Sequence, residues 1–202
     1  MRILPADFSA VSTLMEEYFA SLSDVTDGFF DDNLRQSDVF LLAEDGGEEA
    51  GFFAVQPGER PMLTAFYLRS AYLGNAREIF DRAVDGQGVQ GAFAASCDKG
   101  MMALCLERAV LRGTAVNMQA HFFRLGSAPV RPPEFGPAHV RLLESGEHQW
   151  MNALMRGEWE DTLHTRPDAR YYALEKDGEP LGFGLILPHR LRVGALDIGN
   201  YV

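Results

Sequence analysis

The amino-acid sequence predicts an α/β fold built on a mixed β-sheet. Apolar residues recur at helical spacing in three segments, and short apolar runs typical of strands alternate with them. Glycine-containing turns join neighbouring strands closely enough to form hairpins. Hairpins give antiparallel pairs, whereas strands separated by a helix can pair in parallel, so we expect both kinds of pairing.

The expected helices have apolar residues three or four positions apart, and the expected strands are short apolar or alternating runs. Gly46 and Gly47 supply positive φ angles for the first hairpin, and Gly113 ends the last helix. In chain order we expect a strand at residues 2–4, a helix with apolar positions from Phe8 to Phe19, strands at 39–43, 51–56 and 62–68, a helix at 76–84, a buried strand at 89–95, a helix at 99–112 and a half-buried strand at 116–122.

Composition excludes several classes of protein. With 202 residues, 47% hydrophobic and 23% charged, the chain is expected to be soluble and globular, without a membrane span or a signal peptide. Two cysteines are too few for a disulfide framework, so we expect a cytoplasmic location. The net charge of −11 argues against a nucleic-acid partner. The five histidines show no paired ligand spacing, so no metal is expected.

A proline-rich segment divides the chain. Pro129, Pro132, Pro133 and Pro137 fall within twelve residues, a density that neither a helix nor a central strand accepts. We therefore expect a first domain at residues 1–125, a semi-rigid linker at 126–137 and a second domain at 138–202.

The second domain repeats a pattern of the first. Residues 44–52 resemble residues 175–183 at a constant offset of 131, which also relates Pro57 to Pro188. Arg2-Ile3-Leu4 resembles Arg141-Leu142-Leu143, and Tyr67-Leu68 falls against Tyr201-Val202. The hypothesis is an internal duplication whose second copy stops halfway. A missing C-terminal part, a partner chain that completes the sheet, and a decayed pseudoenzyme are the open explanations.

The hairpin with a Gly-Phe return strand, followed by a strand ending Phe66-Tyr67-Leu68, resembles strands two to four of the GNAT superfamily of CoA-dependent N-acyltransferases. Asn200-Tyr201-Val202 holds the same place in the second repeat. The resemblance implies a GNAT-like fold, as one full repeat plus the N-terminal half of a second. It also implies that acyl-CoA enters beside a bulged fourth strand, and that a glycine-rich turn at the next helix N-terminus holds the pyrophosphate. The implied acetyl-CoA-binding residues are Phe66, Tyr67, Leu68, Gly74, Asn75, Asn200, Tyr201 and Val202.

The first repeat departs from the family motif. Leu73 stands at the Arg/Gln position, and Ala76 and Glu78 replace the two motif glycines. A carboxylate repels phosphate at a helix start, although Arg69 and Arg77 could offset it. In place of the tyrosine that many GNAT enzymes use as general acid, Cys105 or Leu106 is expected, with a buried structural cysteine favoured. The first repeat is therefore expected to be non-catalytic, with a weakened or absent CoA site.

The resemblance implies transfer of an acetyl group from acetyl-CoA to an amine of a small molecule or peptide. On this reading Asp197 is the candidate general base, although a solvent-facing role for its carboxylate stays open. Phe29-Phe30 lies where the family has a substrate-contacting loop, with packing as the alternative role. A non-catalytic GNAT-like protein with a ligand-sensing or dimerisation role is the competing hypothesis, and a homodimer is a possible assembly.

Overall fold

The computed structural model describes residues 1–24, 26, 28–113, 135–144, 147, 168–188, 191 and 196–199. The chain divides into two compact units, Met1–Met118 and Gln119–Val202. Each unit contains a sheet of its own. The predicted strand at 116–122 and most of the predicted linker lie outside the described residues.

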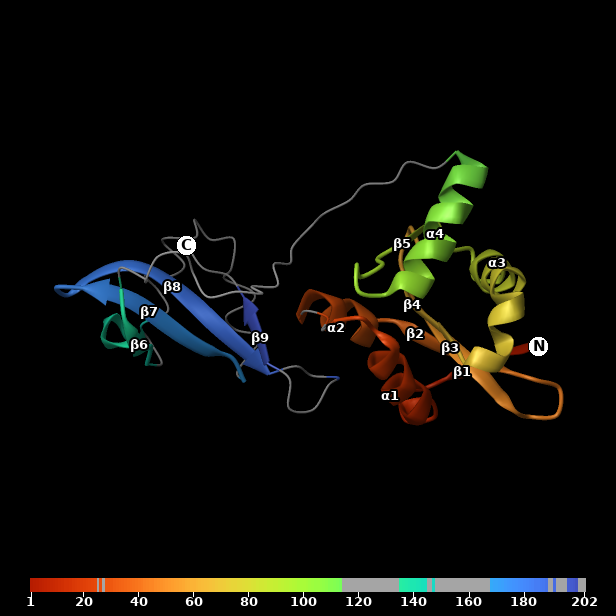
Figure 1. Ribbon diagram of the computed structural model, residues 1–202, viewed down its shortest axis with the longest axis horizontal. Helices are drawn as coiled ribbons and strands as arrows, with labels where there is room; N and C mark the ends of the chain where they lie inside the picture. Colours follow the sequence, from red (N-terminus) through yellow and green to blue (C-terminus); the bar gives the residue numbers. More distant parts are fainter. Residues whose placement is uncertain are drawn as a thin grey trace. The chain divides into compact units, whose positions relative to one another are not determined.

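The first unit is a mixed sheet with helices on both faces, as expected (Figure 1). The strand order is β1-β2-β3-β4-β5, and every pair is antiparallel except β4 with β5, which is parallel. Its elements are β1 (Arg2–Ala6), α1 (Ser12–Ser21), α2 (Gly28–Arg35), β2 (Asp38–Ala43), β3 (Glu49–Gln56), β4 (Met62–Leu68), the 3-10 helix η1 (Ser70–Asn75), α3 (Ala76–Gly86), β5 (Gly91–Ala92) and α4 (Lys99–Arg112).

The core of the first unit lies on both faces of the sheet. Because side chains alternate along a strand, Phe53 of β3 packs toward α3 while its neighbour Phe52 contacts Tyr18 of α1 edge-to-face. On the α3 face, Phe66 meets Phe80 edge-to-face with ring centroids 5.0 Å apart. In Figure 1, α1 and α2 accordingly lie on one side of the sheet and α3 and α4 on the other.

A β-bulge interrupts β4 at Thr64. Ala54 pairs with Ala65, whereas the next residue of β3, Val55, pairs with Leu63, so Thr64 is the extra residue. The insertion shifts the alternation by one, and Leu63 and Phe66 both join the core on the α3 face. Without the bulge the two side chains would point to opposite faces.

Two local signals place the ends of α4 where the sequence predicts them. The Asp98 carboxylate accepts a hydrogen bond from the Met101 N–H at 2.9 Å and caps the N-terminus. Gly113 adopts a left-handed conformation with φ of 64° and ends the helix. In β3, the close approach of β4 requires glycine at position 51, because a Cβ on Gly51 would lie 2.0 Å from the Tyr67 carbonyl oxygen.

Three expectations for the first unit are wrong. The predicted buried strand at 89–95 is reduced to β5, Gly91–Ala92, and Phe93 is 38% exposed. Residues 28–35, expected to be a loop, form α2, where Phe30 is buried against Tyr18 and Phe19. Of the two turn glycines only Gly47 has a positive φ, because the turn needs a left-handed residue at one position.

The second unit is an antiparallel sheet of order β6-β7-β8-β9 (Figure 1). A two-residue turn, Asp177 and Gly178, joins β7 to β8 with positive φ at both positions, as a type I′ turn requires. Its described elements are the 3-10 helix η2 (Pro137–His139), β6 (Val140–Leu142), β7 (Arg170–Lys176), β8 (Glu179–Pro188) and β9 (Leu196–Gly199). Its described core is Leu143, Tyr171, Ala173, Phe183 and Leu185.

Strand pairing corrects the alignment of the two sheets. Leu174 pairs with Gly182 as Leu42 pairs with Gly51, so the offset is 132 on the first strand and 131 on the return strand, because the second turn is one residue shorter. Val140 pairs with Leu174 as Ile3 pairs with Leu42. The opening strands therefore align at an offset of 137, two residues away from the sequence alignment of 139.

None of the helices in the described part of the chain is long and apolar enough to cross a membrane.

Candidate functional site

The outer edge of β4 is the first component of the candidate site. β5 pairs only with Met62 and Leu63, and the Phe93 N–H donates to the Leu63 carbonyl at 2.8 Å as the chain leaves the sheet. The Arg69 N–H donates to Ala50 of β3, so alternation turns the backbone groups of Leu68 and Phe66 outward. Within the described residues, no strand pairs with this part of β4.

The bulge therefore lies where β4 loses its parallel partner. Phe66 and Leu68, two of the predicted coenzyme-binding residues, present backbone groups at the outer edge. The third, Tyr67, has its backbone directed to β3, opposite Phe52. Its phenol donates to the Glu17 carboxylate at 3.2 Å. The edge thus offers outward N–H and C=O groups that can pair with an extended, amide-containing ligand.

An ion-pair cluster fixes the end of β4 to α1. Arg69 donates to both Glu17 oxygens, at 2.9 and 2.8 Å, and to the Glu49 carbonyl at 3.0 Å. The hydrogen bond from Arg69 lowers the pKa of Glu17, which disfavours this carboxylate as a general base. Burial, together with the charge of Glu17, raises the pKa of Tyr67.

The segment expected to bind pyrophosphate is a 3-10 helix. η1 contains Gly74 and Asn75 and runs directly into α3. The Tyr72 N–H donates to the Arg69 carbonyl, and the Ala76 N–H donates to Leu73. These amides are therefore used within the chain, and Glu78 adds a carboxylate to the first turn of α3.

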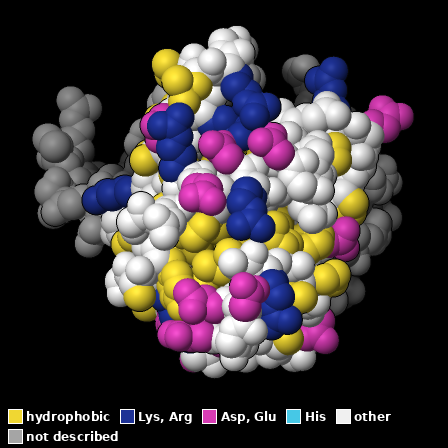
Figure 2. All heavy atoms as spheres, turned by 90° about the vertical axis from the view of Figure 1, so that its right-hand side faces the viewer, with side chains coloured by type: hydrophobic (Ala, Val, Ile, Leu, Met, Phe, Trp, Pro, Cys, Tyr) yellow, Lys and Arg dark blue, Asp and Glu magenta, His cyan; other side chains and the backbone are white. Residues whose placement is uncertain are grey.

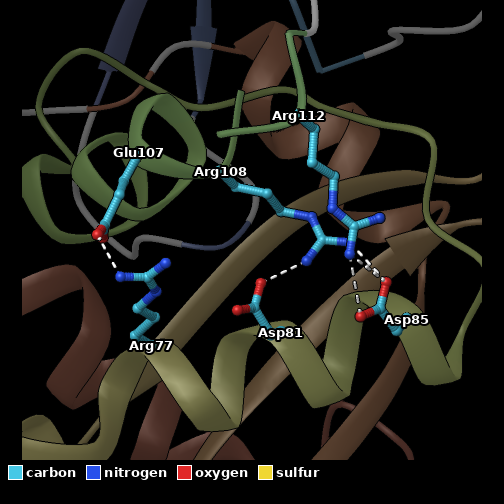
Figure 3. Close-up of polar contacts among 6 residues, drawn as sticks. All are labelled: Arg77, Asp81, Asp85, Glu107, Arg108 and Arg112. Atoms are coloured by element: carbon cyan, nitrogen blue, oxygen red, sulfur yellow. Dashed lines mark hydrogen bonds and ion pairs between the residues drawn. The ribbon is translucent and has the colours of Figure 1, made fainter. Parts of the chain in front are cut away.

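Arg77, at the start of α3, belongs to a ladder of ion pairs between α3 and α4 (Figure 3). It bonds Glu107 at 2.8 Å. Arg108 bridges Asp81 and Asp85, and Arg112 also reaches Asp85, at 3.2 Å. The hydrogen bond from Arg108 lowers the pKa of Asp85. Both arginines that the sequence offered as phosphate ligands, Arg69 and Arg77, are thus paired with carboxylates.

The outer surface of α3 carries an open groove rather than a closed pocket. Figure 2 shows acidic and basic side chains mixed around apolar ones on this face. The groove has a volume of about 670 Å³ and is lined by Ile3, Arg77, Glu78, Asp81, Arg82 and Asp85. Its mixed charges favour no single class of charged ligand, so we do not assign it to the site.

A buried hydrogen bond joins α1 to the start of α4. Tyr18, 1% exposed, donates its hydroxyl to the second carboxylate oxygen of Asp98 at 2.8 Å, and Asp98 is 6% exposed. Burial raises the pKa of Asp98, opposed by hydrogen bonds from Met101 and Tyr18. Burial and the charge of Asp98 raise the pKa of Tyr18 well above its usual value. Sequence reasoning missed this pair because helical spacing placed Tyr18 only in the core, and 80 residues separate the partners.

Cys105 packs against the core of the first unit, whereas Leu106 is 40% exposed. Burial raises the pKa of the Cys105 thiol to about 11, so it is protonated at neutral pH. These observations agree with the favoured interpretation of a structural cysteine.

The predicted residues of the second unit are described only in part. Asp197 lies on β9 and pairs with Leu187. By pairing, its counterpart in the first sheet is Met62 and not Leu63, because β9 has no bulge over its described residues. Asn200, Tyr201 and Val202 lie outside the described residues.

Comparisons with known proteins agree with this architecture. Residues 7–125 match the family model described as an acetyltransferase (GNAT) domain. A search of the curated proteins finds none that matches this sequence.

Solved structures with this fold include a GNAT-family acetyltransferase from Colwellia psychrerythraea, with a TM-score of 0.64 and 16% identity over all of this chain and 77% of that one. A GCN5-related glucosamine N-acetyltransferase region of a fungal multi-domain β-N-acetylglucosaminidase gives a TM-score of 0.50 and 10% identity, over 96% of this chain and 29% of that one. At these identities the likeness concerns the fold alone. The family model covers more than half of the residues, and the chain belongs to the GNAT acetyltransferase family.

Proposed function

We propose that this protein is an N-acetyltransferase that transfers an acetyl group from acetyl-CoA to an amine of a small molecule or peptide. The observation that carries the proposal is the outer edge of β4, where a bulge at Thr64 coincides with the loss of the β5 partner. An edge of this kind can hold the amides of a pantetheine arm and aim backbone N–H groups at a thioester carbonyl.

The residues of the candidate site suit the pantetheine arm of acetyl-CoA better than its pyrophosphate. The β4 edge suits the pantetheine arm, whereas η1, Glu78 and the paired arginines do not suit the pyrophosphate. We therefore expect acetyl-CoA to bind weakly, mainly through its pantetheine and acetyl parts. When bound, it would supply the activated acetyl group, and the amine acceptor stays unassigned.

We also propose that the second unit is half of a GNAT repeat and that Asp197 is its general base. The support is the shared pairing of β6-β7-β8-β9 with β1-β2-β3-β4. Asp197→Asn should lower kcat, with little change in acetyl-CoA affinity. Asp177→Asn is the matched control, because Asn also accepts the left-handed conformation of this exposed turn residue. Equal activity of the two variants would remove Asp197 from the mechanism.

A non-catalytic, ligand-sensing protein is the second candidate. It is favoured by the hydrogen bonds that η1 makes within the chain and by Cys105 at the position where many GNAT enzymes have a general-acid tyrosine. Release of free CoA thiol from acetyl-CoA, measured on the 202-residue chain with a panel of primary amines, separates the two candidates. Amine-dependent release supports the transferase. Saturable acetyl-CoA binding without release supports the sensor, and neither binding nor release rejects both.

A further inference from the structure

The segment between β5 and α4, residues 93–98, leaves the sheet beside the outer edge of β4. The pairing of β5 with β4 ends at Ala92, and the Phe93 N–H then donates to the Leu63 carbonyl. The Asp98 N–H instead donates to the Ala95 carbonyl at 2.9 Å, which turns the chain toward α4. A parallel strand could otherwise extend along the exposed edge, because an edge with free N–H and C=O groups favours further pairing.

Three hydrogen bonds from α1 and its end hold this segment in place. Tyr18 donates to Asp98, and both the backbone N–H and the hydroxyl of Ser23 donate to the Cys97 carbonyl at 3.1 Å. The Tyr18 ring is itself fixed by Phe52 and Tyr67, which belong to β3 and β4. The contact therefore ties the segment to the same strand whose edge it leaves open.

We infer that Tyr18 and Asp98 are positioning residues that hold residues 93–98 away from the outer edge of β4 and so set the width of the β4–β5 gap. The inference rests on the proposed function in one respect: the ligand that the gap would admit is taken to be an acyl-pantetheine group. Asp98 suits the role because its two carboxylate oxygens accept different hydrogen bonds. One caps α4 through Met101, and the other accepts the hydrogen bond from Tyr18.

Tyr18→Phe tests the inference in the full chain, because it removes the hydroxyl and leaves the ring. We expect hydrogen exchange at residues 93–98 to become about tenfold faster, with α1 unchanged, and the Kd for acetyl-CoA to rise about tenfold. Ser21→Ala is the matched control. It also removes one hydroxyl from α1, but the Ser21 hydroxyl bonds the Tyr18 carbonyl and not the segment. The control should change neither quantity.

Asp98→Asn is a second, independent variant. If the one carbonyl oxygen of Asn caps α4, the Tyr18 hydroxyl faces an NH2 donor and no longer a carboxylate oxygen. The contact loses its charge-assisted hydrogen bond, so the variant should also speed exchange at 93–98. In the double variant, Tyr18→Phe with Asp98→Asn, exchange at residues 93–98 should be little faster than in either single variant, since both substitutions remove the same interaction. Unchanged exchange at 93–98, or a uniform rise across the first unit, would overturn the inference. Absence of acetyl-CoA binding by the unaltered chain would instead reject the proposed function, and exchange would still decide the contact.

Discussion

The first and second sheets use matched strand pairings but differ in how their faces are covered. In the first sheet, Leu42, Phe53 and Val55 are at most 5% exposed because α3 and α4 pack on them. The matching face of the second sheet includes Val140 and Leu142, which are 49% and 53% exposed. Strand pairing alone therefore does not bury a face of a sheet, and in the first sheet this face is buried by α3 and α4.

The largest expected difference between the sheets is at Leu42 and its counterpart Leu174. Leu42→Ala should lower the free energy of unfolding of the first unit by about 3 kcal/mol, because it leaves a cavity in a closed core. Leu174→Ala should cost roughly half as much or less, since Leu174 is only half-buried. Denaturant unfolding followed by hydrogen exchange resolved to each sheet measures both. Equal costs would contradict the comparison.

Gly51→Ala should be nearly as damaging, at roughly 3 kcal/mol. The added Cβ would meet backbone at 2.0 Å, so β3 and β4 must separate to admit it. Gly46→Ala is the matched control, because its Cβ would meet nothing within 4 Å. The thermal midpoint of the first unit measures the effect, and a midpoint as high as that of the control would show that β4 can move aside.

Thr64→Val tests the bulge, which the described part of β9 lacks. The Thr64 hydroxyl lies 2.7 Å from the Ser37 hydroxyl and 3.3 Å from the Ala54 carbonyl oxygen, so its single proton is donated to one of the two. Losing these bonds should cost about 1 kcal/mol, because Ser37 keeps its bond to the Asn33 carbonyl. Urea unfolding measures the cost. A loss as large as that of Leu42→Ala would mean that the hydroxyl, and not the inserted residue alone, maintains the bulge.

The smallest expected effects are electrostatic and have opposite pH dependence in the two units. Arg141 lowers the pKa of Glu175 below 4.5, so their stabilisation is present above that pH and is lost as pH falls. Burial raises the pKa of Asp98 above 3.8, so the stability linked to its protonation is present at low pH and is lost as pH rises through the raised value.

Arg141→Ala and Asp98→Asn test these two pH dependences when the free energy of unfolding is measured from pH 3 to pH 7. The deficit of Arg141→Ala should shrink toward low pH and in high salt, because the pair is exposed. The advantage of the unaltered chain over Asp98→Asn should shrink toward high pH. If the stability lost in the two variants changed with pH in the same direction, the opposite pH dependences of the Arg141–Glu175 pair and of Asp98 would be contradicted.

Periodicity predicts most of the first unit because its strands and helices bury one clear face each. The strand Met62–Leu68 and the helix Lys99–Arg112 have the predicted bounds, the latter because Asp98 and Gly113 are local end signals. The failures have tertiary causes. β5 stops after Ala92, and the segment that follows is hydrogen-bonded to Tyr18 and Ser23, which are distant in the chain. The pattern of α2 is weak because, among its residues of described burial, only Phe30 and Leu34 are apolar and buried.

The candidate site is less predictable because it depends on pairing between distant residues. The sequence identifies Phe66 and Leu68, but not that the bulge at Thr64 aligns their backbones with the unpaired edge. It identifies Arg69 and Arg77 as cations, but not that Glu17 and Glu107 already occupy them. A contact such as Tyr18 with Asp98 joins residues far apart in the chain, and local patterns carry no information about it.

The most direct test of the account compares acetyl-CoA with acetyl-pantetheine by isothermal titration of the 202-residue chain. If the β4 edge is retained and the phosphate site is not, the two ligands should bind with Kd values within about threefold of each other, because the shared part supplies the contacts. Hydrogen exchange at Phe66 and Leu68 should slow with both. Binding of acetyl-CoA alone, about a hundredfold tighter, would show a working phosphate site, and failure of both ligands to bind would remove the β4 edge as the site.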